Sequence, residues 1–210
     1  MKSEKRKREI VLASRNKNKA KEIKDILKGQ GVSILTLDNF RNLPEVEEDG
    51  ETFEENAKKK ALTIAKLTKR LTIADDSGLE VDALGGLPGV RSARFAGVGC
   101  TYADNNRKLL EMLEGFPKAR RRARFLCTIA IADGAGLVGI ASGQSIGHIG
   151  FVPKGRHGFG YDPVFVAPRC KKTFAELGPR IKNKISHRAR ALAKARAIIE
   201  GYLRRSAAVS

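Results

Sequence analysis

Thr72-Ile73-Ala74-Asp75-Asp76-Ser77-Gly78-Leu79 is the stretch that decides the fold, because it joins a buried apolar run to two adjacent carboxylates. The run predicts a short interior strand that ends at the two Asp residues and is followed by a Ser-Gly turn. Successive strand residues point to opposite faces, so one carboxylate is expected to face a cleft while the other ties down the surrounding loop. An ionised carboxylate is costly to bury unless it is paired or holds a metal. A solvated turn after an ordinary strand is the alternative, and the other motifs decide between the two.

Strands and helices alternate along the residues before this stretch. Ser14-Arg15-Asn16-Lys17-Asn18-Lys19 is a polar turn between the first strand and the first helix. Backbone N–H groups at a helix N-terminus attract phosphate, which makes this loop a candidate phosphate site. Thr52 and Glu55 have the spacing of a capping box and predict where the next helix begins. The expected elements are strands at 9–13 and 32–35 and helices at 20–29 and 53–68.

The residues after the central stretch predict a more antiparallel half. Asp133-Gly134-Ala135-Gly136 is a hairpin signal between an apolar strand at 123–132 and a returning strand at 137–142, which residues 146–149 extend. A helix is expected at 101–114, and Ser186 is the candidate N-cap of a long helix that runs to Leu203. Together these patterns predict an α/β fold with a central mixed, twisted sheet and flanking helices.

An acidic cluster between Glu45 and Asp49 stands out in the loop before the second helix. Mg²⁺ in proteins is typically held by one or two carboxylates plus substrate phosphates, so these residues are candidate cation ligands beside Asp75 and Asp76. The alternative is a solvated loop that stabilises the positive end of the following helix.

Two further segments have residue types suited to a nucleotide. The glycines of 155–163 allow the backbone to approach a ligand, while Phe159 and Tyr161 offer flat faces and Asp162 offers an acceptor for a purine. The alternative is a glycine-rich loop whose aromatic side chains belong to the core. His187 and Arg188 lie in the first turn of the last helix, where a cation is unfavourable against the helix dipole. Their charge therefore indicates a bound nucleotide, and an ordinary exposed helix start is the alternative.

Composition limits the class of protein. The formal charge of +18 over 210 residues favours polyanionic partners or, alternatively, a lysine- and arginine-rich solvated surface. The three cysteines are odd in number and lack metal-ligand spacing, which is typical of reduced thiols in the cytoplasm. No apolar run approaches the roughly 20 residues needed to span a bilayer, and the basic N-terminus lacks the apolar stretch of a secretory signal. We expect a basic, disordered tail at 1–8, one domain at 9–205 and a second tail at 206–210.

The motifs together resemble those of the inosine triphosphate pyrophosphatase family, in the same order and over nearly the whole chain. The resemblance rests on Ala74-Asp75-Asp76-Ser77-Gly78-Leu79, Gly86-x-Pro88-Gly89-x-x-Ser92-Ala93-Arg94, Gly158-Phe159-Gly160-Tyr161-Asp162-Pro163 and Ile185-Ser186-His187-Arg188. It implies two lobes around a nucleotide cleft, a homodimer, and Mg²⁺-dependent hydrolysis of dITP, ITP and XTP to the monophosphate and pyrophosphate. This activity removes non-standard purines from the nucleotide pool.

The resemblance also implies roles for individual residues. Asp76 corresponds to the general base and metal neighbour, and Glu47 to the metal-binding carboxylate. Asn56 corresponds to a residue that braces the site. The substrate-binding residues implied in this way are Ser14, Arg15, Asn16, Lys17, Asn18, Lys19, Ser77, Phe159, Gly160, Tyr161, Asp162, Lys182, His187 and Arg188.

This chain departs from the family pattern in its first loop. The family usually has Thr-Gly-Asn-x-Gly-Lys, and here Arg15 and Asn18 replace the two glycines. Asn18 is a mild change because asparagine tolerates left-handed geometry, whereas Arg15 brings bulk near the phosphates. Two other functions are open. One is a related pyrophosphatase with a different base preference. The other is a basic nucleic-acid-binding protein, although nucleic acid is not required by the motifs and no RNP-type or zinc pattern supports it.

Overall fold

The computed structural model describes residues 8–167 and 170–208. The expected N-terminal tail therefore lies outside the described residues except for Arg8, which begins the first strand. At the other end, the last helix continues to Ala208 and includes most of the segment expected as a second tail. Among the described residues, no helix has the length and apolar character that a membrane span requires.

Strands and helices alternate up to β3, as the sequence predicts, and the predicted hairpin follows as β4 and β5. The strands are β1 (Arg8–Leu12), β2 (Val32–Thr36), β3 (Thr72–Val81), β4 (Arg122–Ala132), β5 (Leu137–Ile149), β6 (Phe165–Ala167) and β7 (Lys172–Thr173). The helices are α1 (Lys17–Leu27), α2 (Phe53–Thr68), α3 (Tyr102–Met112), α4 (Phe174–Ile185) and α5 (His187–Ala208).

The described strands form one sheet in the order β2-β1-β3-β4-β5-β6-β7. Strand β1 pairs in parallel with both β2 and β3, whereas β6 pairs antiparallel with β5 and with β7. The predicted α/β fold with a central mixed sheet is thereby confirmed. The chain divides into two compact units, the first with residues 8–76, 128–142 and 191–208, the second with 77–127 and 143–190 apart from 168–169.

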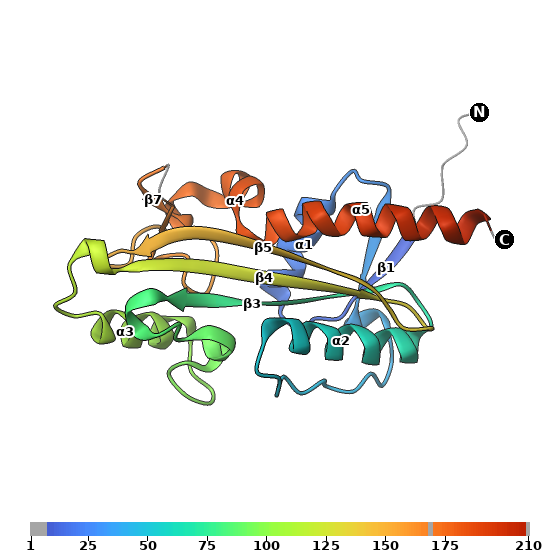
Figure 1. Ribbon diagram of the computed structural model, residues 1–210, viewed down its shortest axis with the longest axis horizontal. Helices are drawn as coiled ribbons and strands as arrows, with labels where there is room; N and C mark the ends of the chain where they lie inside the picture. Colours follow the sequence, from blue (N-terminus) through green and yellow to red (C-terminus); the bar gives the residue numbers. More distant parts are fainter. Residues whose placement is uncertain (1–7, 168–169, 209–210) are drawn as a thin grey trace. The chain divides into compact units, whose positions relative to one another are not determined.

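The core of the first unit lies between α2 and the strands (Figure 1). Thr52 caps α2 and Glu55 closes the capping box, as predicted, and the buried stripe of α2 is mostly apolar, with Asn56 and Lys60 as its polar members. On the opposite face, α5 packs so closely on β5 that a Cβ at Gly139 would lie 2.9 Å from Ile198. The buried residues of this core, between α2 and the strands, are Val11, Ala13, Leu37, Ala57, Ala61, Ile64, Ala65, Ala74, Ala130 and Ala132.

The core of the second unit is built from larger side chains. Phe125, Phe165 and Phe174 pack with ring centroids 4.7 to 5.9 Å apart. Helix α4 supplies Phe174 and is absent from the sequence-based expectations, because Gly178 and Pro179 interrupt its helical pattern. The remaining members are Leu79, Val81, Leu109, Leu113, Ala123, Ile149, Tyr161, Val164 and Ala167.

Two boundaries near the candidate site differ from the sequence prediction. Strand β3 does not end at Asp76 but continues through the Ser-Gly pair to Val81, because both carboxylates are paired and the strand stays buried. Helix α1 begins at Lys17 rather than Ala20, because the side chain of Asn16 accepts hydrogen bonds from Asn18 N and Lys19 N at 3.0 and 3.1 Å.

Candidate functional site

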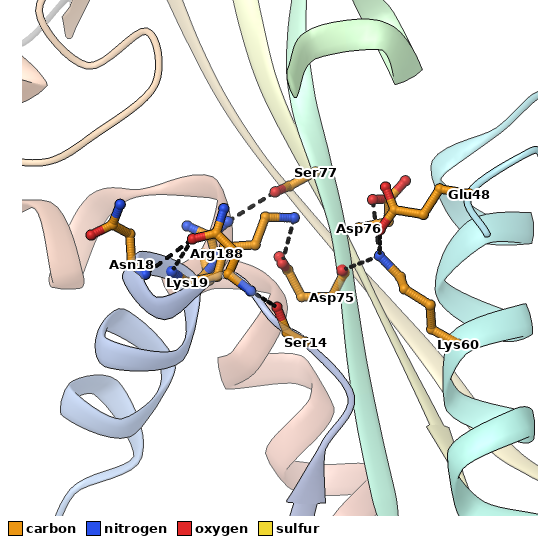
Figure 2. A network of polar contacts seen from close by, with 10 residues as sticks. Ser14, Asn18, Lys19, Glu48, Lys60, Asp75, Asp76, Ser77 and Arg188 are labelled. Carbon is orange, nitrogen blue, oxygen red and sulfur yellow. Dashed lines mark hydrogen bonds and ion pairs between the residues drawn. The ribbon is translucent and has the colours of Figure 1, made fainter. Parts of the chain in front are cut away.

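The two carboxylates of β3 point to opposite faces of the strand, and each meets a lysine (Figure 2). Nζ of Lys19 lies 2.8 Å from Oδ1 of Asp75, which is fully buried. Nζ of Lys60 lies 3.2 Å from Oδ1 of Asp76 and 2.8 Å from the carbonyl oxygen of Asp75. Strand alternation therefore places one ammonium on each side of the central stretch.

The Ser14–Lys19 segment is organised by β1 and α1. Ala13 N donates to Ile73 O at 2.8 Å, so this segment begins beside the strand that carries the carboxylates. Ser14 Oγ accepts from Asn16 N at 3.2 Å, and Asn16 then caps the helix. The positive N-terminal end of the α1 dipole and the side chain of Lys19 thus lie in the same segment. This is an arrangement that binds phosphate.

Arg15 and Asn18, which stand where the family usually has glycine, do not distort this segment. Arg15 is exposed and its guanidinium donates to Leu43 O at 2.9 Å. Asn18 lies in the first turn of α1 and has no positive φ, so the left-handed tolerance of asparagine is not needed here. Lys17 and Asn18 are both exposed.

Lys60 is a residue of the candidate site that the sequence analysis missed. Its Nζ lies 2.5 Å from Glu48 Oε1 as well as 3.2 Å from Asp76, and its side chain is only 9% exposed. The available signal was its position on α2, where a lysine interrupts the buried stripe between Ala57 and Ile64. A lysine on the buried face of a helix needs a partner, and here two carboxylates provide it.

The acidic loop approaches the site through Glu48. Asn56 holds this loop, because its Oδ1 accepts from Gly50 N at 2.8 Å, and a Cβ at Gly50 would lie 2.9 Å from that oxygen. Glu47, the carboxylate implied by the family resemblance, is exposed and its side chain forms no hydrogen bond or ion pair among the described residues. Its role as a metal ligand stays a prediction, and Glu48 is a second candidate.

The chemistry of these groups fits a divalent cation. Asp76 and Glu48 already share one positive charge, that of Lys60. Among the described residues no three His, Cys, Asp or Glu side chains form a complete metal cluster. Mg²⁺ characteristically uses one or two carboxylates and takes its other ligands from water and substrate phosphates.

Burial changes the acid–base properties of this pair. It raises the pKa of Asp76 above its ordinary value of 3.8, against the opposing influence of Lys60 and Lys19. Burial acts to lower the pKa of Lys60, but the charges of Asp76 and Glu48 outweigh it and raise that pKa. A carboxylate with a raised pKa is a better proton acceptor, which suits a general base.

The second unit holds the other predicted substrate-binding residues. Asp162 accepts from Phe159 N at 2.8 Å and from Lys182 Nζ at 2.5 Å. Gly158 has a φ of +78°, and a Cβ there would lie 2.0 Å from Asp162 Oδ2, so only glycine fits. The half-buried ring of Phe159 lies 4.8 Å from the ammonium of Lys182 and 5.7 Å from the guanidinium of Arg188.

The first turn of α5 is buried rather than exposed. Ser186 Oγ accepts from Ala189 N at 3.2 Å, as expected of the predicted N-cap. Arg188 donates to Ser77 Oγ at 2.8 Å, so two predicted substrate contacts are in contact with each other. The ring of His187 stacks on Phe125 at 4.6 Å with 10° between planes, and the residue is 3% exposed, so an exposed helix start is excluded.

Tyr161 belongs to the core and not to an open aromatic face. It is 4% exposed, its hydroxyl donates to Ser92 O at 2.9 Å, and burial raises its pKa. The contribution of Tyr161 is therefore to anchor the loop, while Phe159 retains the more accessible ring.

Asn106 is a second contact of this loop that the sequence did not indicate. Its Nδ2 donates to Tyr102 O at 2.8 Å and to Gly160 O at 2.9 Å. Its buried Oδ1 has no hydrogen-bond partner among the described residues. A buried unsatisfied oxygen destabilises by about 1–3 kcal/mol, so the amide is retained at a cost and fixes the carbonyl of Gly160.

Comparisons with known proteins show which family the chain resembles. Two relatives named dITP/XTP pyrophosphatase come from Desulforamulus reducens, 53% identical over 190 residues, and Geobacter sulfurreducens, 50% identical over 184 residues. The matches cover 90% and 88% of this chain and 94% and 92% of the relatives, respectively. The solved Ham1 protein of Staphylococcus aureus superposes with a TM-score of 0.82 at 39% identity, over 93% of this chain and 100% of that one.

A HAM1 protein from Coxiella burnetii gives a TM-score of 0.83 at 41% identity, over 92% of this chain and 99% of that one. The sequence model of the Ham1 family matches residues 10–198, which include both β3 with its carboxylates and the start of α5. These matches confirm the resemblance drawn from the motifs, and the chain belongs to the Ham1 family.

Proposed function

We propose that this protein is a nucleoside-triphosphate pyrophosphatase that hydrolyses dITP, ITP and XTP to the monophosphate and pyrophosphate. The buried Asp76, with a raised pKa and an ammonium held against it, is the observation that carries the proposal. The relatives named dITP/XTP pyrophosphatase match over nine-tenths of their length and support the same substrates. The biological role that follows is removal of non-standard purines from the nucleotide pool.

In this reaction a water oxygen attacks the α-phosphorus, and the bond from that phosphorus to the bridging oxygen of the β-phosphate breaks. Asp76 accepts the proton of the attacking water, and pyrophosphate leaves with the bond electrons. Lys60 donates to Asp76 and keeps its carboxylate oriented. The N-terminus of α1 and Lys19, held by Asp75, position the phosphates and stabilise their charge.

Mg²⁺ is the proposed cofactor. Asp76, with Glu47 or Glu48, supplies the hard oxygen ligands it needs. When bound, it neutralises phosphate charge and polarises the phosphoryl oxygens.

Purine selection is assigned to the loop around Phe159. The Phe159 ring offers a stacking face, and backbone N–H groups near it, together with His187, are candidate donors to a 6-keto oxygen. A site that donates there rejects adenine, because the amino group of adenine leaves the donors unpaired.

A homodimer in the cytoplasm completes the proposal. The three free cysteines support a reducing compartment, and light scattering in solution tests the dimer.

The deciding experiment is hydrolysis of dITP, XTP and dATP with and without Mg²⁺, resolving pyrophosphate from orthophosphate. We expect pyrophosphate from dITP and XTP, little turnover of dATP, and dependence on Mg²⁺. Orthophosphate as the product, or equal rates on dATP, would replace the proposal with a different phosphohydrolase on the same fold.

A further inference from the structure

A basic recess lies in the second unit, formed by residues with no part in the proposed reaction. It has a volume of about 490 Å³ and is lined by Lys118, Ala119, Arg122, Gly147 and His148. These residues come from the turn before β4, the start of β4 and the end of β5. The recess is largely open to solvent, its volume is within the range of about 300–1,000 Å³ typical of small-ligand sites, and none of the described residues that line it is acidic.

The buried guanidinium of Arg121, next to Arg122 in the chain, acts electrostatically on His148 of this recess. Arg121 is 2% exposed and donates to the carbonyl oxygens of Leu113 and Gly150 at 2.7 Å and of Ile149 at 2.9 Å. The guanidinium also lies 4.6 Å from the centroid of the Phe151 ring. Within the described residues no carboxylate pairs with Arg121. Three carbonyl dipoles compensate this buried charge in part, and an anion bound nearby would add to that stabilisation.

The charges at the recess act on one another. Burial lowers the pKa of His148, and the positive charges of Lys118 and Arg121 lower it further. The pKa of Arg121 is itself lowered by burial. The charge contribution to the His148 shift shows that the cations act on its ring, and an anion bound there would oppose their effect.

The two cations at the recess are available to a ligand. Lys118 forms no salt bridge with any residue that the structure describes. Arg122 lies 3.5 Å from Asp82, but both side chains are more than half exposed. Exposed pairs of this kind contribute about 0–1 kcal/mol, so the guanidinium can turn toward a better acceptor.

We propose that this recess binds a small phosphate-bearing anion, such as inorganic phosphate or pyrophosphate, through Lys118, Arg122 and His148. Guanidinium and ammonium groups suit the charge and geometry of phosphate oxygens. Glu80 and Asp82, which pair with Arg124 and Arg122, interrupt the basic surface along β4. That interruption favours a compact anion over the extended backbone of a nucleic acid.

The ring of His148 provides a local readout, since the chain has three histidines and a His148→Gln variant assigns the signal. Phosphate and pyrophosphate are titrated separately against the full chain while the histidine ring resonances are followed by NMR. We expect a saturable shift of the His148 signal and a higher His148 pKa with ligand bound. Lys118→Gln should weaken binding about fivefold or more, and Asp82→Asn should strengthen it because Arg122 loses its competitor.

Arg120→Gln is the matched control. Arg120 is exposed, its guanidinium lies over the Phe116 ring at 5.0 Å, and it does not line the recess. The Arg120→Gln substitution therefore removes one positive charge, as Lys118→Gln does, without removing a lining group. Equal weakening in Arg120→Gln and Lys118→Gln would reduce the effect to general surface charge and overturn the proposal. The proposal also fails if His148 does not respond to either anion, or responds only to a short oligonucleotide. None of these outcomes depends on dITP hydrolysis, so the proposed function is tested separately.

Discussion

The ammonium of Lys60 lies 3.2 Å from Oδ1 of Asp76 and 2.5 Å from Oε1 of Glu48, so two carboxylates from different segments share one buried cation. This relationship ties the acidic loop, α2 and β3 together at one point. It also explains how β3 can carry an acidic residue in its interior without ending there, since the charge of Asp76 is compensated in place.

Asp76→Asn should lower pyrophosphate release from dITP by about two to four orders of magnitude, the usual contribution of a general base. Asparagine has nearly the same shape, so the far-ultraviolet circular dichroism spectrum should be unchanged. Glu54→Gln is the control, because it removes an exposed carboxylate from the same unit. Turnover within a few fold of the unaltered enzyme would exclude Asp76 as the base.

Lys60→Met should destabilise the fold by about 3–5 kcal/mol, because it leaves Asp76 buried without its closest counter-charge. Urea denaturation measures the change in the free energy of unfolding. Adding Asp76→Asn to Lys60→Met should recover part of the loss, since the stranded carboxylate is then removed. Additive losses in the double variant would show that the two side chains are not coupled.

Glu47→Gln and Glu48→Gln separate the two candidate metal ligands. A thermal-shift titration with Mg²⁺ should show weaker stabilisation in the variant that lacks the true ligand, because cation binding to the folded state raises the unfolding temperature. Glu48→Gln should in addition lower stability without Mg²⁺, since Glu48 pairs with Lys60 and Glu47 makes no such contact. If neither variant changes the response to Mg²⁺, the acidic loop is not part of the metal site.

Asn106→Leu should reduce the preference for dITP over dATP about tenfold, equivalent to about 1.4 kcal/mol, by releasing the carbonyl of Gly160. The measurement is kcat/KM for each nucleotide. Asn105→Leu is the matched control. Asn105 is equally buried on α3, but it bonds Ala93 and Ala96 and not the Phe159 loop. A similar loss of selectivity in both variants would assign the effect to general destabilisation of α3.

His148 should make stability fall as the pH is lowered. Its pKa is below 6.5 in the folded protein, chiefly through burial and then through Lys118 and Arg121. An unfolded chain takes up a proton near 6.5 while the folded one does not, so unfolding is favoured as pH drops from 6.5 toward the folded pKa. Among the neighbouring charges, Arg122 and Asp82 keep theirs throughout this window.

Urea denaturation across that window measures the effect, and His148→Gln should flatten the pH dependence. An unchanged slope in His148→Gln would mean that another group controls the titration.

The sequence alone determined most of the local elements of this protein and their order, but not β6, β7 or α4. The capping box at Thr52, the hairpin at Asp133-Gly134-Ala135-Gly136 and the N-cap at Ser186 were all predicted where they occur. These features depend on neighbours a few residues apart, so a short window of sequence contains their physics. The motif around Asp76, together with those at 86–94, 158–163 and 185–188, likewise indicates the family from the sequence alone.

The tertiary structure decided which charges meet. Lys60 reaches Asp76 across 16 positions and Asn106 reaches Gly160 across 54, and no local pattern encodes such pairs. No local pattern encodes the end of β3 or the burial of His187 and Tyr161 either. From the sequence alone, a charged or aromatic residue of this kind is expected to be exposed. The side chains that neutralise or cover it come from distant segments, which only the fold brings next to it.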